Sequence, residues 1–63
     1  MEEKVIKSLL GKLRQPIHVE YISKYILKTS MNETTDVLNK LIQEDIIEES
    51  EYAKNYFVIK HKD

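Results

Sequence analysis

Apolar residues recur at three- and four-residue steps through the first part of the chain. This spacing places them along one side of an α-helix, so the pattern predicts a helix from Glu2 to Leu13 with a single buried stripe. Pro16 ends the element, because the residue before a proline is biased away from helical geometry. Gly11 is costly inside a helix and is expected to mark a close crossing with another helix. The stripe consists of Val5, Ile6, Leu9, Leu10 and Leu13.

Two further helices are predicted in the middle of the chain. The first spans Val19 to Leu27, although His18 stands where a hydroxyl or carboxylate cap is expected, so only an imidazole nitrogen could satisfy the first free amides. The second begins after Ser30, because Ser30 and Glu33 have the spacing of a capping box, in which each side chain satisfies an unpaired amide. Its apolar stripe is predicted to be the centre of the core and comprises Thr34, Val37, Leu38, Leu41 and Ile42.

The pattern changes after residue 45. Residues 46–50 and 56–60 are rich in β-branched and aromatic side chains with polar residues between them, which is typical of strands. The connection at residues 51–55 contains no Asn-Gly or Asp-Gly pair, so a loop longer than two residues is expected. The elements together predict an α+β fold of three helices and a C-terminal two-stranded β-hairpin.

Length and composition limit the chain further. A chain of 63 residues buries only roughly 60% of its unfolded surface, so we expect residues 1–63 to form a single small domain. The absence of cysteine excludes disulfides, a thiol nucleophile and cysteine zinc sites. No charged-then-apolar leader and no twenty-residue apolar span is present, so a soluble cytoplasmic protein without membrane association is expected.

One segment carries a more specific pattern. Residues 38–48 run leucine, two polar residues, leucine, three mostly polar residues, Asp45, an apolar residue, isoleucine and a polar residue. With the order of elements, this resembles the winged-helix variant of the helix-turn-helix family, in which a glycine usually occupies the position of Asp45. Aspartate is among the few residues that adopt the left-handed conformation needed there. The resemblance covers nearly the whole chain and implies a winged-helix fold with a short extra strand near Ile17, and with Phe57 and Ile59 facing the core.

The resemblance also implies a function. In this family the exposed side of the third helix enters the major groove of DNA, so the likeness implies a DNA-associated transcriptional regulator. Asparagine side chains can bond an adenine edge, a threonine can touch a thymine methyl or a phosphate, and nearby lysines can hold phosphates. The implied nucleic-acid contacts are Lys28, Asn32, Thr35, Asn39, Lys40 and Lys54.

The near-neutral total of ten basic and eleven acidic residues conceals a division along the chain. Residues 1–28 carry six basic and three acidic side chains, whereas residues 29–54 carry two basic and seven acidic ones. Affinity for DNA comes largely from neutralised phosphates, so an acidic third helix and wing predict weak duplex binding unless a homodimer supplies further contacts.

The same acidic segment supports an alternative, in which the third helix and wing bind a basic protein partner. Tyr52, near the tip of the predicted wing, is the hardest aromatic residue to bury and is the best candidate for an interface anchor. A solvated face that keeps a small domain soluble would show the same charges, and the sequence leaves these interpretations open. The residues of the protein-binding alternative are Met31, Asp36, Glu48, Glu49 and Tyr52.

No catalytic, cofactor or metal site is predicted. His18 and His61 are the only histidines and lack paired-ligand spacing. The carboxylates lie in predicted exposed runs, without an apolar wall that would raise a pKa for acid–base chemistry. One glycine cannot build a phosphate-binding loop. We therefore expect a protein that acts by binding and is not an enzyme.

Overall fold

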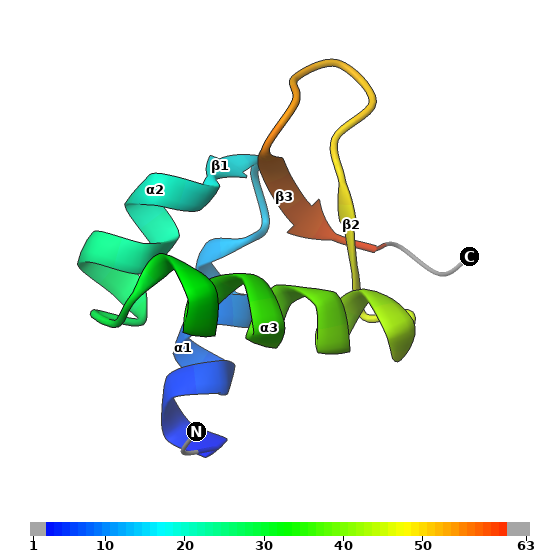
Figure 1. Cartoon of the computed structure of the whole chain (residues 1–63). Coiled ribbons are helices and arrows are strands. Elements are labelled where there is room, and N and C mark those ends of the chain that lie inside the picture. Colours follow the sequence, from blue (N-terminus) through cyan, green and yellow to red (C-terminus); the bar gives the residue numbers. More distant parts are fainter. Residues whose placement is uncertain (1–2, 61–63) are drawn as a thin grey trace.

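The computed structural model describes residues 3–60, which form three helices and a three-stranded antiparallel sheet (Figure 1). The helical elements are α1 (Glu3–Lys12), α2 (Val19–Tyr21), its π-helical continuation η1 (Ile22–Ile26) and α3 (Met31–Gln43). The strands are β1 (Ile17–His18), β2 (Ile47–Glu49) and β3 (Tyr56–Ile59). The predicted α+β class, C-terminal hairpin and short strand at Ile17 are confirmed. Glu2 and His61, for which the sequence carried expectations, lie outside the described residues.

The central strand of the sheet is β3, which pairs antiparallel with β1 on one side and β2 on the other. Ile17 lies opposite Phe57, and Ile47 lies opposite Ile59. Phe57 and Ile59 are half-buried and pack against the core, as the sequence predicted. The β2–β3 connection is longer than a two-residue turn, which is also the predicted outcome.

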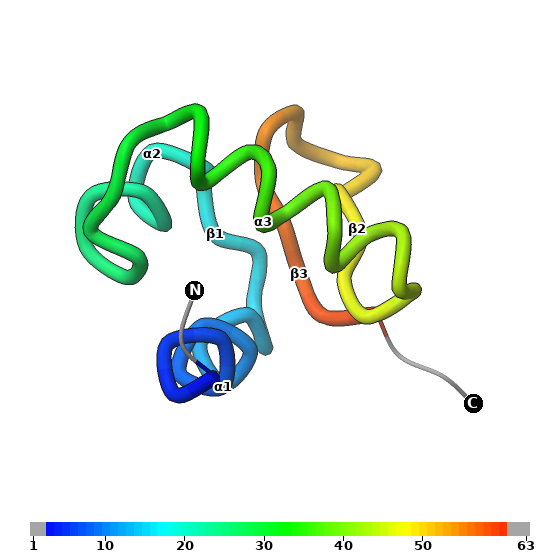
Figure 2. The backbone as a smooth tube through the Cα atoms, turned by 60° about the horizontal axis from the view of Figure 1, so that its bottom comes forward, coloured from blue at the N-terminus to red at the C-terminus, as the bar shows by residue number. Residues whose placement is uncertain are grey.

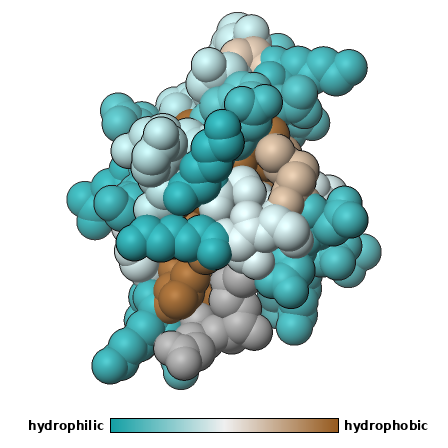
Figure 3. Space-filling view, turned by 60° about the vertical axis from the view of Figure 1, so that its left-hand side comes forward, coloured by the Kyte–Doolittle hydropathy of each residue, from teal (hydrophilic) through white to brown (hydrophobic). Residues whose placement is uncertain are grey.

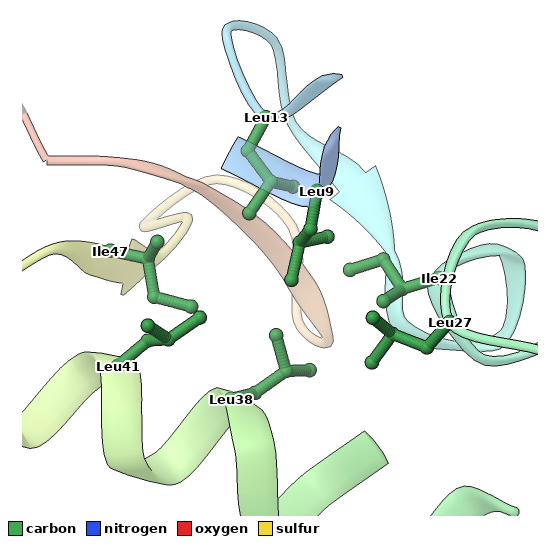
Figure 4. Packing of buried hydrophobic residues seen from close by; sticks show 7 residues of the cluster. All are labelled: Leu9, Leu13, Ile22, Leu27, Leu38, Leu41 and Ile47. Atoms are coloured by element: carbon green, nitrogen blue, oxygen red, sulfur yellow. The ribbon is translucent and has the colours of Figure 1, made fainter. Parts of the chain in front are cut away.

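The core lies where α1, η1, α3 and β2 converge (Figure 4). In the stripe predicted for α3, Thr34 is buried like its leucines and Val37 is half-buried, but Ile42 is exposed. Ile42 follows Leu41 by one residue, a rotation of about 100° that carries its side chain out of the core. The buried apolar residues are Leu9, Leu13, Ile22, Leu27, Leu38, Leu41 and Ile47.

The second helix predicted from Val19 to Leu27 is confirmed, but it is α-helical only in its first turn and continues as a π-helix. Leu27 donates its N–H to the carbonyl of Ile22, five residues earlier, at 2.8 Å. In an α-helix Leu27 would point about 140° away from Ile22. The wider turn brings both side chains into the core, where Figure 4 shows them beside each other. Burial of Leu27 therefore explains the π-helical segment.

Polar side chains cap the starts of α2 and α3. The Nδ1 atom of His18 accepts the N–H of Glu20 at 3.1 Å, which confirms the expected imidazole cap. The hydroxyl of Ser30 accepts the N–H of Glu33 at 3.2 Å, which confirms the first half of the capping box. The second half differs, because the Glu33 carboxylate accepts the Thr29 hydroxyl at 2.6 Å in place of the Ser30 amide.

At its other end α3 stops as the sequence predicted. Asp45 has φ 66°, in the left-handed region. The N–H groups of Asp45 and Ile46 donate to the carbonyls of Ile42 and Leu41, both at 3.0 Å, which is the pairing of a Schellman motif. The ammonium of Lys60 bonds the Asp45 carboxylate at 2.6 Å. Asp45 therefore joins the end of α3 to the end of the sheet.

The expectation that Gly11 marks a close helix crossing is wrong. A Cβ atom at this position would meet nothing within 4 Å, and the residue is exposed near the end of α1.

Figure 3, which brings the side of α2 and η1 forward, shows a mainly hydrophilic surface with an apolar patch low on that face. The half-buried apolar residues around the core include Val5, Ile6, Leu10 and Ile26.

Candidate functional site

The solvent side of α3 carries a row of polar side chains. Asn32, Asp36, Asn39 and Gln43 follow one another at steps of four, three and four residues, and all four are exposed. At about 100° per residue they share one line along the helix, opposite the buried Thr34 and Leu41. The row therefore contains three carboxamides and one carboxylate, that of Asp36. Gln43 was not among the predicted contacts, although its spacing from Asn32 and Asn39 was visible in the sequence.

Beside this row is a hollow of about 440 Å³, between α3, the start of α2 and the end of the β2–β3 connection. The buried Leu38 and half-buried Phe57 contribute to its lining. Thr35 and Asn39 reach it from α3, and Asn55 reaches it from the connection. Two of the predicted DNA contacts thus border a concave surface together with a residue of the β2–β3 connection.

Asn55 is held in place by its backbone. It has φ 69°, donates its N–H to Glu49 Oε2 at 2.8 Å, and its carbonyl accepts the N–H of Val19 at 2.9 Å. These bonds fix the end of the connection against β2 and the start of α2. The sequence did not single out Asn55, because no glycine follows it to mark a tight hairpin turn.

The predicted phosphate contacts are exposed but are not gathered at one place. Lys28 lies between η1 and α3 with φ 53°, and Lys54 directly precedes Asn55. Lys40 lies about 140° around α3 from Thr35, on the flank away from the hollow. The structure thus brings Thr35, Asn39 and the Lys54–Asn55 segment near one hollow and leaves Lys40 apart.

Several acidic residues that argued against DNA binding have partners within the fold. Glu33 accepts the Thr29 hydroxyl, and Glu49 accepts the Asn55 amide. Asp45 bonds Lys60, and this hydrogen bond, with the charge of Asp45, raises the pKa of Lys60 above its usual value. The central charge on the solvent side of α3 is Asp36.

The structure distributes the residues of the protein-binding alternative over different surfaces. Met31 and Asp36 are both exposed but point about 140° apart on α3. Glu48 is half-buried opposite Val58 in the hairpin. Tyr52 in the connection is 96% exposed. The fifth residue, Glu49, accepts a hydrogen bond from the connection. These five residues come from α3, β2 and the connection and do not share one face of a single element.

Between residues 3 and 60, no three histidine, aspartate or glutamate side chains are grouped closely enough to hold a metal ion. Within the same range, no helix has the length and apolar character needed to cross a membrane. Comparison with known proteins finds no family model, curated protein or solved structure that matches this chain. The geometry of the chain is therefore the basis for proposing a function.

Proposed function

We propose that this protein is a winged-helix regulator that contacts duplex DNA with α3 and the β2–β3 connection. The observation that carries the proposal is the row of carboxamides on the solvent side of α3. Asn32, Asn39 and Gln43 are exposed, while the opposite side of the helix is packed into the core. Carboxamides can bond two adjacent groups on the major-groove edge of adenine, so this row has the chemistry of base recognition.

The arrangement of the elements supports the same proposal. Three helices are followed by a hairpin, and α3 and the end of that hairpin's connection line one hollow. Figure 2 shows the β2–β3 connection and the first half of α3 on the side of the molecule away from α1. A duplex placed along α3 would meet Thr35 and Asn39 first, and Lys28 and Lys54 would then hold phosphates at either side.

Asp36 sets the expected strength of binding. A carboxylate in the middle of the carboxamide row repels phosphates, and binding strength depends mainly on the phosphates that are neutralised. We therefore expect weak, salt-sensitive binding by a monomer. A homodimer on paired half-sites would double the phosphate contacts.

The test is a titration of isotopically labelled protein with short AT-rich and mixed duplexes at about 50 mM salt, where a few phosphate contacts suffice for detectable binding. We expect amide shifts at Asn32, Thr35, Asn39 and Lys54 that fade as salt is added. The double variant Asn32→Ala/Asn39→Ala should lose the shifts, while Ser8→Ala, at an exposed polar position on α1, keeps them. Absence of shifts in the wild type would overturn the proposal.

Substitution of Asp36 gives a second test of the same surface. Asp36→Asn removes the central negative charge, so we expect duplex affinity at about 50 mM salt to rise roughly threefold to tenfold, with a smaller gain at higher salt. Glu44→Gln makes the same charge change on another flank of the helix end and should have a smaller effect. Fluorescence anisotropy with a labelled duplex measures both. Equal gains in the two variants would show that DNA does not lie along the Asp36 side.

A second candidate function is favoured by Tyr52. Its side chain is 96% exposed, in a connection that also carries Glu51, and tyrosines are frequent anchors of protein interfaces. In this alternative the wing binds a basic protein. Tyr52→Ala should then release a partner that co-purifies with the wild type, whereas Tyr25→Ala should retain it. An unchanged set of bound proteins in the Tyr52 variant would contradict this alternative.

A further inference from the structure

A second, larger hollow lies on another part of the surface, where α1 ends and β1 begins. It measures about 720 Å³ and is open to solvent, within the size range of roughly 300–1,000 Å³ that is usual for small-molecule sites. Its lining comes from the end of α1, the segment that follows, β1, α2 and the start of β3, and includes no residue of α3. It therefore differs from the proposed duplex-binding surface, and His18 is the one residue that lines both hollows among residues 3–60.

The charged side chains that the structure describes in this lining are both basic. Lys12 and Arg14 contribute to it, and no aspartate or glutamate among residues 3–60 does. Both side chains are exposed, so their ammonium and guanidinium groups are accessible to a ligand. Arginine and lysine at a concave surface attract phosphate groups, arginine by a two-pronged hydrogen bond and lysine as a point charge. Among residues 3–60, no lysine or arginine lines the smaller hollow beside α3, so the two hollows differ in charge.

Aromatic rings line the same hollow. Tyr21 is 50% exposed and Tyr56 is 37% exposed, so each ring has a surface that a ligand can cover. Neighbouring rings hold both of them: Tyr56 meets His18 edge-to-face at 5.0 Å between centroids, and Tyr21 lies 4.8 Å from Tyr25. Rings that are held and exposed are suited to stacking with a nucleic-acid base.

His18 and Gln15 add hydrogen-bonding groups to this surface. Because Nδ1 of His18 accepts the Glu20 amide, the hydrogen of the neutral imidazole lies on Nε2, which makes that atom a donor. The Gln15 carboxamide is exposed in the lining and can both donate and accept. A base and a phosphate would both find partners here.

We propose that this hollow binds a nucleotide unit, with the base stacked on Tyr21 or Tyr56 and the phosphate held by Lys12 and Arg14. The unit is supplied either by a single-stranded nucleic acid or by a free nucleotide, since both present the same base and phosphate. Basic side chains and exposed aromatic rings are each common on protein surfaces. Here Lys12, Arg14, Tyr21 and Tyr56 line the same hollow, and no carboxylate of residues 3–60 lies among them.

The test uses two probes, a fluorescein-labelled twelve-residue oligothymidylate and thymidine monophosphate. Binding of the first is followed by anisotropy, and binding of both is followed by tyrosine fluorescence, which tryptophan does not obscure because the chain has none. Affinity at least about tenfold higher per molecule for the oligomer identifies a single strand as the ligand, because several phosphates and bases then contribute. Comparable affinities identify a free nucleotide. Either result supports the proposal.

Matched variants distinguish the hollow from general charge attraction. Lys12→Glu/Arg14→Glu should weaken probe binding about tenfold or more, whereas Lys4→Glu/Lys7→Glu, the same charge change on α1 outside the hollow, should weaken it about twofold or less. Tyr21→Ala should weaken binding about tenfold, whereas Tyr21→Phe, which keeps the stacking ring, should not. Amide spectra of each variant establish that it is folded.

Three results would overturn the proposal. The first is that neither probe binds at about 50 mM salt, where phosphate contacts act strongly. The second is an equal loss in the two charge-reversal variants, which would show attraction by net charge alone. The third is loss of oligomer binding in Asn32→Ala/Asn39→Ala with normal binding in the hollow variants, which would place the strand on α3. Failure here leaves the duplex proposal intact, because its variants and its probe are different.

Discussion

In this chain, residues other than glycine adopt the left-handed backbone conformation at sharp turns. Between residues 3 and 60, Lys28, Asp45 and Asn55 adopt positive φ, whereas Gly11, the only glycine of the chain, does not. Aspartate and asparagine tolerate this conformation, and lysine is less suited to it, at a cost of roughly 1–2 kcal/mol. Asp45 was predictable because it occupies the glycine position of a known pattern. Lys28 was not, because lysine has no preference that marks such a turn.

Thr34 is another residue whose environment determines a measurable property. Its hydroxyl is buried and has no hydrogen-bond partner among residues 3–60, although the side chain lies in the core stripe of α3. A buried hydroxyl without a partner costs roughly 1–3 kcal/mol, so Thr34→Val, which keeps the shape, should raise the free energy of unfolding by about 1 kcal/mol. Urea unfolding measures this change. Thr35→Val, at an exposed position, is the control and should give no gain; an equal gain there would contradict the explanation.

At the scale of elements, the sequence predicts a helix or strand correctly where its apolar spacing and its start and stop signals indicate the same element. In α3 the apolar period, the Ser30 cap and the Asp45 terminus all indicate the same helix. The second helix was predicted at the observed position, but its π-helical part was not, because two turn geometries compete for its apolar residues. Ile22 and Ile26 fit an α-helix, but the structure buries Leu27 with Ile22 by means of a five-residue turn. The π-helical turn depends on packing against α1 and α3. The spacing of apolar residues within the second helix carries no information about those neighbours.

The helix α1 offers a prediction of its own. Gly11 is helical, exposed and surrounded by open space, so it gives α1 flexibility without serving a contact. Gly11→Ala should therefore increase the free energy of unfolding by about 0.5–1 kcal/mol, because alanine loses less backbone entropy in a helix. Denaturant unfolding tests it, with Ser8→Ala as a control of smaller expected gain. A loss of stability would mean that Gly11 makes a contact in solution after all.

At the scale of the whole molecule, folding assembles surfaces that no stretch of sequence displays. Asn32 and Asn39 were predictable as neighbours because one helix carries both. The hollow beside them was not, since its lining joins His18, Thr35 and Asn55 from three separate segments. The larger hollow likewise joins the C-terminal end of α1, β1 and the start of β3. Sequence spacing identifies a helix face, but concave sites depend on how distant segments pack.

Global stability should depend on alkaline pH through the ion pair of Lys60 with Asp45. Because Asp45 raises the pKa of Lys60, the folded protein binds this proton more tightly than the unfolded chain does. The contribution is therefore complete below the unfolded pKa, near 10.4, and is lost as pH rises through the higher folded value. Urea midpoints of the wild type should fall more steeply than those of Lys60→Gln over this alkaline range.

The control for this pH dependence is Lys54→Gln, which removes the same charge elsewhere and should keep the steep alkaline fall of the wild type. Both side chains of the pair are partly exposed, so the difference between wild type and Lys60→Gln should shrink in high salt. Parallel curves for wild type and Lys60→Gln would contradict a role of the pair in stability.

The short outer strands of the sheet have a consequence for behaviour at high concentration. β1 has two residues and β2 has three, two of which are glutamates, and both strands lie at the edges. Unpaired edge strands are templates for pairing with other chains, and short length and charge are the usual obstacles to it. The short length of both edge strands and the glutamates of β2 therefore disfavour intermolecular β-sheet formation and fibril growth, whatever the protein binds.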